Sequence, residues 1–311
     1  MLPRIVDVLD EPIGDPAAIN TVLMCQAARD VGVKVLLSGM GADELFGGYR
    51  KHLACVLGAR YQTLPKTLRS RVVAPGVERL PVAAGGRGLR YSRWAKRFLT
   101  FAELPEEAAF RRSYTLYDPD ELRGLLDPEL SGQVQAVVDA HRRLYTDGGL
   151  PDHVNRMCLT DSRLFLPGLN LAYTDRSSMS TSTEVRVPFV DPYVFQAAFS
   201  FRGAQKIRGR TQKVPLRHVA EDQVPRDVLD RPKASFGAPL RAWVTNDLGP
   251  LIDDVLLDGR LVSSGFLRLQ PLRRMVSDQR SGRSDQSKQL WQLLSMELWY
   301  RSVTAAGVSA P

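Results

Sequence analysis

The chain has 311 residues, of which 44% are hydrophobic and 24% are charged, as is typical of a globular protein with one large core or two smaller ones. No apolar stretch reaches the roughly 18 residues of a membrane span. Acidic residues also interrupt the apolar N-terminus, which excludes a signal peptide. We therefore expect a soluble, cytoplasmic protein without a membrane partner.

The formal net charge of +8 and the pI near 9.6 could suit a nucleic-acid-binding protein, because basic surfaces attract phosphates. The arginines are scattered, however, and aromatic residues are not interleaved with them in a repeating way. No helix-turn-helix, RRM or zinc-finger spacing occurs. These features favour solvated surface charge and predict that the protein has no nucleic-acid partner.

The three cysteines, Cys25, Cys55 and Cys158, are widely spaced and form no C-x-x-C pair. This spacing indicates neither a disulfide framework nor a zinc site, so we expect packing thiols. None of them stands at position 2, where an N-terminal-nucleophile glutaminase would need a cysteine after loss of Met1. The sequence thus predicts no glutaminase chemistry in this chain.

The first predicted element is a helix over residues 17–31, where apolar residues recur at near-helical spacing behind an N-cap and first-turn proline at Asp15 and Pro16. Gly32 ends it. The run VKVLLSG that follows is short, apolar and β-branched, and it stops at a Ser-Gly turn. That pattern predicts a buried parallel strand.

Helical periodicity dominates the rest of the chain. Loops are expected in the Pro- and Gly-rich stretch 64–88, and at least two helices in residues 105–147, separated at residues 117–119. A further helix is expected over residues 153–166 and should end at Pro167-Gly168. The predicted fold class is α/β with predominantly helical content.

Only one convincing strand is apparent, whereas a doubly wound sheet needs several, so the chain reads as one that begins in the middle of a domain. The predicted organisation has three parts. They are a partial nucleotide-binding α/β segment at 1–60, a mostly helical remainder at 61–303, and a frayed tail at 304–311.

The strongest motif is SGMGADELFGGY, residues 38–49, directly after the predicted strand. A Ser-Gly-x-Gly turn at the carboxyl end of a parallel strand exposes backbone N–H groups and lets the chain approach an anion closely, as phosphate binding requires. Asp43 and Glu44 repel phosphate unless a magnesium ion lies between them. Spacing alone favours equally a helix N-terminus whose acids complement the helix dipole.

Four ordered blocks carry a specific resemblance. SGMGADELFGGY, preceded by DEPIGDPAA, is similar to a signature of the glutamine-hydrolysing asparagine synthetase family. Three later blocks also match, and they are LFLPGLNLAYTDRSSMSTSTEVRVPFVD, KIRGRTQKVPLRHVA and PRDVLDRPKASFGAPLRAWV. The resemblance covers roughly residues 9–245, and by it the chain is identified as an N-terminally truncated C-terminal synthetase domain of that family.

The resemblance implies an ATP-pyrophosphatase fold, similar to adenine nucleotide alpha hydrolases, followed by a helical region. It implies ATP and Mg²⁺ as cofactors. A small-molecule carboxylate, aspartate by default, would be adenylated and then attacked by ammonia, either free or derived from glutamine. The family is also compatible with a homodimer. The expected function is thus that of a carbon–nitrogen ligase in asparagine biosynthesis.

The resemblance also assigns roles to residues. Three residues would lie against the nucleotide, and they are Ser38, Gly39 and Gly41. Asp43 would be the magnesium ligand, and Glu44 would orient the metal site or the acyl substrate. Lys233, in RPKASF, matches the family's lysine that neutralises charge on the departing pyrophosphate. From spacing alone, Lys233 would be an ordinary loop cation.

Several further charged residues have two open interpretations. Asp161 and Asp175 could face the active site as substrate contacts, or each could be a cap or an ion-pair partner. Arg208 and Lys213, in the KIRGRTQK block, could screen phosphate charge or lie exposed. Glu184, with the arginine two residues later, is suited to a buried ion-pair network that fixes a helix end.

Two departures from the family pattern limit these expectations. The Ser-Gly-Gly-x-Asp-Ser pyrophosphate loop and the preceding glutaminase domain are absent from the chain, so the triphosphate would lack preorganised donors. The chain alone is therefore expected to be inactive. Met40 stands where many asparagine-forming members carry an acid, and a thioether cannot act as a general base.

Three functional hypotheses follow. The first is a truncated asparagine synthetase-like amidotransferase that forms an amide through an acyl-adenylate. The second keeps the ligase chemistry but changes the acceptor, as in a polysaccharide or secondary-metabolite pathway, which Met40 would suit. The third is a non-catalytic remnant that binds nucleotide without turnover.

Overall fold

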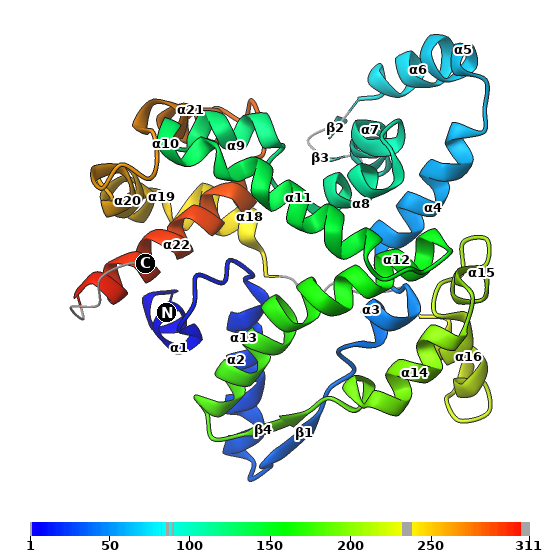
Figure 1. The fold of residues 1–311 in the computed structure, drawn as a ribbon. Coiled ribbons are helices and arrows are strands. Elements are labelled where there is room, and N and C mark those ends of the chain that lie inside the picture. The colour runs from blue at the N-terminus through cyan, green and yellow to red at the C-terminus, as the bar shows by residue number, and fades with distance from the viewer. Residues whose placement is uncertain (1, 82, 85–86, 89, 232–237, 306–311) are drawn as a thin grey trace.

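The computed structural model describes residues 2–81, 83–84, 87–88, 90–231 and 238–305. A continuous helical rod, made of α12 (His153–Thr160), η2 (Asp161–Leu171) and α13 (Ala172–Met179), runs diagonally through the middle of the molecule in Figure 1. In Figure 1 the helices of the C-terminal third lie above the rod and α4 (Arg50–Gln62) rises from its α12 end, while α14 (Pro192–Ser200) lies below it. The rod therefore lies between the main groups of helices.

The first sixty residues form a helix–helix–strand–helix–helix sequence. Before α4, these elements are α1 (Leu2–Leu9), α2 (Ala17–Asp30), β1 (Val35–Leu37) and α3 (Ala42–Phe46). The predicted helix over 17–31 is confirmed, and an Asp15 carboxylate oxygen accepts a hydrogen bond from the N–H of Ala17 at 2.9 Å. Asp15 and Pro16 thus start α2, but each lies one position earlier than predicted, since Pro16 is the N-cap residue and Ala17 the first helical residue.

The strand β1 pairs in parallel with β4 (Glu184–Arg186), and Val35 stands opposite Glu184. The predicted parallel strand is confirmed in position, but its predicted burial is wrong, because Val35 is 42% and Leu37 76% exposed. The strand β4 was missed, since Glu184-Val185-Arg186 reads as a charged stretch. In the described part of the chain β1 and β4 form a two-stranded sheet, and the only other sheet pairs β2 (Ala83–Ala84) with β3 (Arg87–Gly88).

The middle of the chain is almost entirely helical. After α4 come three short helices where loops were expected, and they are α5 (Lys66–Leu68), η1 (Arg69–Val73) and α6 (Ala74–Glu78). That expectation was wrong for residues 66–78, which form one continuous helical run with Pro65 at its N-cap, where no N–H donor is needed. Pro75 lies inside this run, directly after the π-wound η1, where a wider turn can accommodate its missing N–H. The helices that follow are α7 (Arg90–Ala102), α8 (Glu106–Tyr114), α9 (Pro119–Leu125), α10 (Pro128–Ser131) and α11 (Gln133–Thr146).

The break predicted at residues 117–119 is confirmed. Asp118 caps α9 by accepting hydrogen bonds from the N–H groups of Asp120 and Glu121, and the Glu121 carboxylate accepts one from the N–H of Asp118. These reciprocal bonds satisfy N–H groups that the helix start would otherwise leave unpaired.

The predicted helix end at Pro167-Gly168 is wrong. The helix beginning at His153 continues through Pro167 to Met179, and residues 161–171 are wound as a π-helix. A wider turn changes the register of the backbone hydrogen bonds, so the missing N–H of a proline can be accommodated without ending the helix.

The remaining elements complete the two sides of the molecule. Two elements of the next part of the chain contact α3, and they are α14 (Pro192–Ser200) and α16 (Val214–Ala220). The same part contains η3 (Pro188–Val190), α15 (Gly203–Lys206) and α17 (Arg226–Leu229). The C-terminal group contains α18 (Leu240–Ala242), η4 (Trp243–Asp247), α19 (Gly249–Leu251), η5 (Ile252–Leu257), α20 (Arg260–Ser263), α21 (Leu269–Arg280) and α22 (Ser287–Ala305). Thr304 still belongs to α22, and residues 306–311 of the predicted tail lie outside the described residues.

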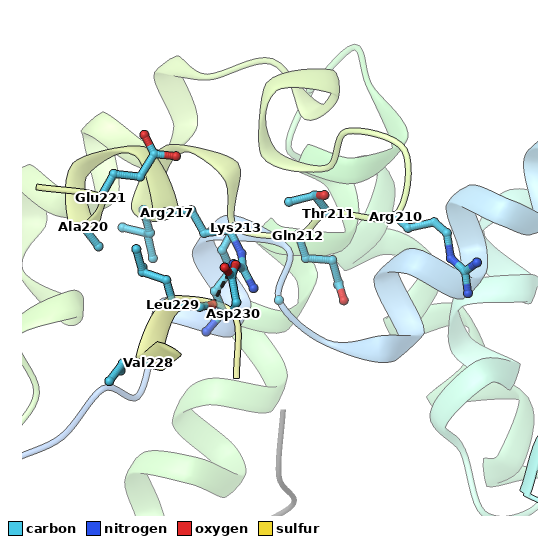
Figure 2. A pocket seen from close by; sticks show the side chains of 12 residues that line it. Arg210, Thr211, Gln212, Lys213, Arg217, Ala220, Glu221, Val228, Leu229 and Asp230 are labelled. Atoms are coloured by element: carbon cyan, nitrogen blue, oxygen red, sulfur yellow. Dashed lines mark hydrogen bonds and ion pairs between the residues drawn. The ribbon is translucent and has the colours of Figure 1, made fainter. Parts of the chain in front are cut away.

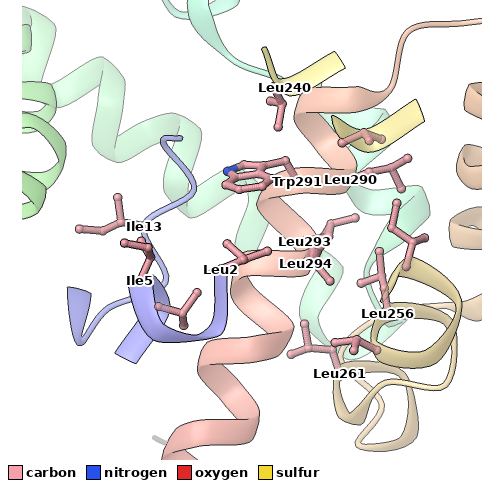
Figure 3. Packing of buried hydrophobic residues seen from close by; sticks show 14 of the residues in the cluster. Leu2, Ile5, Ile13, Leu240, Leu256, Leu261, Leu290, Trp291, Leu293 and Leu294 are labelled. Atoms are coloured by element: carbon pink, nitrogen blue, oxygen red, sulfur yellow. The ribbon is translucent and has the colours of Figure 1, made fainter. Parts of the chain in front are cut away.

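The largest apolar core joins the two ends of the chain. Leu2 and Ile5 of α1 belong to the same buried cluster as Leu290 and Leu294 of α22 (Figure 3), together with Leu256. At roughly 1.5–3 kcal/mol for each fully buried leucine or isoleucine, this packing holds α1 and the C-terminal helices in one unit.

The three cysteines are buried free thiols, which confirms the prediction of packing thiols. Cys55 and Cys158 pack in a second apolar cluster around Phe110. Burial raises the pKa of both thiols to about 12, so they remain protonated at neutral pH. Within the described ranges, no helix is long and apolar enough to cross a membrane.

Candidate functional site

The glycine turn after β1 is held by the neighbouring strand. The N–H of Ser38 donates a 2.8 Å hydrogen bond to the Arg186 carbonyl, so the β1–β4 pairing extends to the start of the turn. Gly41 has φ +89°, a conformation that L side chains rarely adopt, and a Cβ there would lie 3.1 Å from Cβ of Phe189. A Cβ at Gly39 would meet nothing within 4 Å. The turn is therefore packed at Gly41 and open at Gly39.

Asp43, in the first turn of α3, forms an ion pair across the fold. Its Oδ1 lies 2.8 Å from Nζ of Lys213, which precedes α16. A Cβ on Gly48 would fall 2.0 Å from the same Oδ1 and 2.1 Å from Cε of Lys213. A side chain at position 48 would therefore collide with both charged side chains, and glycine leaves room for their ion pair.

A cavity of about 780 Å³ opens beside this ion pair, and Gly48, Lys213, Arg217 and Asp230 are among the residues that line it. Figure 2 shows Gln212 and Lys213 on the segment before α16. The Gln212 side-chain amide donates to the carbonyls of Gly47 and Tyr49, at 2.6 and 2.8 Å. The glutamine thus fixes the segment that carries Lys213 against the end of the glycine motif.

Glu44 is buried behind the turn, with 1% of its surface exposed. Its Oε1 accepts hydrogen bonds from the Tyr49 hydroxyl at 2.7 Å and from the Asn170 amide at 2.6 Å, and the same amide donates to the Tyr49 oxygen at 2.9 Å. Burial, followed by the Glu44 charge, raises the pKa of Tyr49 well above its usual range. Tyr49 therefore stays a hydroxyl donor at all physiological pH values.

Asp161 forms the second buried carboxylate site, at the start of η2. Its two oxygens lie 2.7 Å from Nζ of Lys51 and 2.8 Å from Nε2 of His52. Burial opposes ionisation of this carboxyl, but the Lys51 charge and the His52 hydrogen bond outweigh it, and the pKa of Asp161 falls below its ordinary value. The carboxylate therefore stays charged and anchors Lys51.

The structure brings most of the predicted site residues together. Five of them occupy the turn and the first turn of α3, and they are Ser38, Gly39, Gly41, Asp43 and Glu44. Asp161 faces α4, which follows the same motif, whereas Asp175 is exposed on α13. Lys233 lies outside the described residues. Arg208 is exposed, whereas Lys213 lines the cavity together with Arg210 of the same block.

The predicted burial of the Glu184 and Arg186 pair is wrong. The two side chains do form an ion pair of 2.7 Å, but they are 55% and 63% exposed and belong to β4. Residues two apart point to the same side of a strand, so alternation around Val185 brings the charges together on an exposed face.

Sequence reasoning did not single out Lys51, His52, Tyr49 or Asn170. Lys51 and His52 follow the glycine motif directly, so their place next to it was a usable signal. Asn170 carried no such signal, because it meets Glu44 only when the helical rod crosses α3.

A magnesium ion would need phosphate oxygens in this site. Within the described ranges, no group of three or more His, Cys, Asp or Glu residues could hold a metal ion by itself. Mg²⁺ commonly takes one or two carboxylates and completes its shell with substrate phosphates and water. Asp43, 23% exposed and beside the cavity, fits that requirement as a single protein ligand.

Comparisons with known proteins give one family. The family described as asparagine synthase matches residues 1–301, beyond the predicted range of 9–245. A putative glutamine-hydrolysing asparagine synthetase of Mycobacterium tuberculosis is 34% identical over 300 residues, which cover 96% of this chain and 44% of that protein. No solved structure matches significantly.

Two further relatives are more distant. Glutamine-hydrolysing asparagine synthetase 1 of Bacillus subtilis is 27% identical over 302 residues, covering 96% of this chain and 45% of that protein. The amidase chyE of Penicillium rubens is 22% identical over 279 residues, covering 82% of this chain and 40% of that protein. The chain thus spans less than half the length of these curated relatives.

Proposed function

Because the chain belongs to the asparagine synthase family, we propose that it supplies the synthetase site of an ATP-dependent ligase that forms an amide from a carboxylic acid and ammonia. The observation that carries the proposal is the Asp43–Lys213 ion pair beside the open glycine turn and next to a cavity. Paired opposite charges at such a turn suit a magnesium-bound phosphate chain.

The proposed reaction has two steps. An oxygen of the acid's carboxylate attacks the α-phosphorus of ATP, and the bond to the bridging oxygen breaks so that pyrophosphate leaves. Ammonia then attacks the acyl carbon, the bond to AMP breaks, and the surplus nitrogen proton passes to solvent. Mg²⁺, when bound, would neutralise phosphate charge. This proposal also includes ATP and Mg²⁺ as cofactors, the ATP-pyrophosphatase fold and aspartate as the default acid. It further includes glutamine as a source of ammonia, a homodimer and a cytoplasmic location.

The residues of the site would have separate roles. Asp43 would hold the metal, and Lys213 would neutralise charge that develops on the departing pyrophosphate, a role that the family resemblance gave to Lys233. Ser38 and Gly39 would leave room for the nucleotide, since Gly39 faces open space. Glu44 would act as a positioning residue through Tyr49, because its carboxylate is buried and already holds two donors.

Met40 favours an acceptor other than aspartate as the second candidate. Its sulfur accepts a 3.0 Å hydrogen bond from the Thr174 hydroxyl, and its side chain packs against the main apolar core. A thioether held in this way neither accepts a proton from an amine nor binds it by charge. The acid and the amine would therefore be selected by other residues.

The proposal is tested by titrating the chain with ATP in the presence and absence of Mg²⁺ in a calorimeter. Binding that requires Mg²⁺ and weakens about tenfold in Lys213→Met is expected, with unchanged binding in Lys66→Met, a control at an exposed lysine of α5. Pyrophosphate release is then assayed with the chain mixed with the part of the Mycobacterium tuberculosis relative that precedes the matched region. Lack of Mg²⁺-dependent ATP binding even in that mixture would contradict the proposal.

A further inference from the structure

A second cavity, of about 810 Å³, lies next to the α4 end of the site. Its walls come from α4, α7, α8, η2 and the start of α22, with residues 14–16 of the segment before α2. Cavities of roughly 300–1,000 Å³ hold ligands larger than an amino acid. The size of this cavity therefore suits an extended organic molecule.

The lining of this cavity is rich in positive charge. Four basic residues contribute to it, and they are Arg50, Lys51, Arg97 and Lys288, against the single carboxylate of Asp15. Lys51 is neutralised by Asp161, but Arg50 and Arg97 form no ion pair with any residue in the described part of the chain. Two guanidinium groups without a carboxylate partner favour an anionic ligand, and a planar carboxylate is one of the groups that arginine binds through two hydrogen bonds.

The same lining is rich in aromatic rings, including those of Trp94, Phe98, Tyr114 and Phe165. Nζ of Lys51 lies 4.1 Å from the ring centroids of both Tyr114 and Phe165, and Asp161 holds it there. These rings offer a flat ligand faces and edges to stack against. Aspartate, which has no ring, would leave most of this surface without a partner.

One short segment of chain contributes lining residues to both cavities. Gly48 lines the first cavity, beside the Asp43–Lys213 pair, while Arg50 and Lys51 line the second. Tyr49 stands between them and is fixed by Glu44. An adenylating enzyme needs its acid and its nucleotide phosphates close together, and lining residues only two positions apart in the sequence are compatible with that arrangement.

We propose that the second cavity is the acceptor site and that it binds a carboxylic acid carrying an aromatic ring. Arg50 and Arg97 bind the carboxylate, and the rings of Trp94, Phe98 and Tyr114 enclose the aromatic group. This inference rests on the proposed function for its reaction, since it names the acid that the ligase activates. The binding site itself is defined by the cavity alone.

Calorimetry on the 311-residue chain tests this with three probes that separate charge from ring. 3-Phenylpropanoate has both features, 3-phenylpropan-1-ol has only the ring, and aspartate has only the charge. We expect 3-phenylpropanoate to bind at least about tenfold more tightly than either of the others. Arg50→Ala and Arg97→Ala should each weaken the binding of 3-phenylpropanoate about tenfold. Arg60→Ala, at an exposed arginine of α4, should not.

The outcomes are decisive in both directions. Equal binding of aspartate and 3-phenylpropanoate, or unchanged 3-phenylpropanoate binding in the Arg50→Ala/Arg97→Ala double variant, overturns the inference. Displacement of 3-phenylpropanoate by ATP, with loss of ATP binding in Arg50→Ala, overturns it too and makes this cavity the nucleotide site. If 3-phenylpropanoate binds but Mg²⁺-dependent ATP binding fails, the proposed function fails and the acid site stands. Circular dichroism confirms that each variant is folded.

Discussion

The side-chain amide of Asn170 lies 2.6 Å from Oε1 of Glu44, although the two residues belong to helices far apart in the sequence. Both side chains are buried, and the amide also reaches the Tyr49 hydroxyl. Three polar groups thus satisfy one another directly behind the glycine turn. Buried carboxylates are tolerated when donors surround them in this way.

Asn170→Ala is expected to destabilise the fold by about 1–3 kcal/mol, because it leaves the buried Glu44 carboxylate with one donor fewer. Urea unfolding followed by circular dichroism measures the loss. Asn246→Ala, at an exposed asparagine, is the matched control and should change the free energy of unfolding by less than about 0.5 kcal/mol. Similar values for the two variants would show that the Glu44 contact does not contribute to stability.

The Asp161 carboxylate makes stability depend on acidity. Its folded pKa lies below its unfolded value of about 3.9, so the unfolded chain binds more protons in the window between the two values. The stabilisation is complete above the unfolded pKa and is lost as the pH falls through the folded pKa. The free energy of unfolding should therefore fall in this window, as chemical denaturation at a series of pH values would reveal.

Asp161→Asn should remove this contribution to the fall in stability at low pH. It should also lower the free energy of unfolding at neutral pH by about 3–5 kcal/mol, since it leaves Lys51 buried without its counter-charge. Asp222→Asn, at an exposed aspartate, should leave both properties unchanged. If the free energy of unfolding of Asp161→Asn fell as steeply with decreasing pH as that of the unmodified chain, other groups would cause the pH dependence.

Gly48→Ala should separate Asp43 from Lys213, because the added Cβ would fall 2.0 Å from Oδ1 of Asp43. The expected result is a loss of about tenfold or more in Mg²⁺-dependent ATP affinity by calorimetry. Gly58→Ala, within α4, is the control. A Cβ there meets its nearest atoms at 3.8 and 3.9 Å, and alanine favours the helix, so this variant should bind ATP normally and be no less stable. Normal ATP affinity in Gly48→Ala would show that the Asp43–Lys213 ion pair does not contribute to ATP binding.

Exposed apolar residues on β1 should make the chain associate at high concentration. Within the described residues β1 has one strand partner, and its other edge keeps its backbone donors and acceptors available, while Leu37 is 76% exposed. Leu37→Lys is expected to weaken association about tenfold in sedimentation velocity. Val137→Lys removes an apolar side chain that is 67% exposed on a helix, and it should have no such effect. A monomer at all concentrations would contradict the prediction.

The sequence predicted the parts of the fold that depend on neighbours along the chain. The helix after Asp15-Pro16, the strand before Ser38 and the capped break at Asp118 all follow from local patterns. Features that depend on distant segments could not be predicted in the same way. The strand at Glu184–Arg186 has no apolar pattern of its own, and it is ordered by pairing with β1. Its exposed ion pair follows from that pairing.

The site shows the same division. The glycine turn with Asp43 and Glu44 could be predicted, because the motif is continuous in the sequence. The partners that fix those side chains could not, since Asn170 and Lys213 reach them from segments far along the chain. The role of Lys233 depends on the family resemblance alone. For both Lys213 and Arg208 the sequence left open whether the side chain screens phosphate charge or is exposed, and the ion pair with Asp43 and the place in the cavity lining distinguish Lys213.

The hydrogen bond from Ser38 to Arg186 has a consequence for the order of folding. The turn that begins the site depends on a strand far along the chain, so a ribosome must synthesise residue 186 before the turn can be fixed. Closing so long a loop is entropically costly, and contacts between distant segments form slowly. The helices α2 and α4, whose hydrogen bonds are local, can form earlier, and assembly of the glycine turn is then a late step of folding.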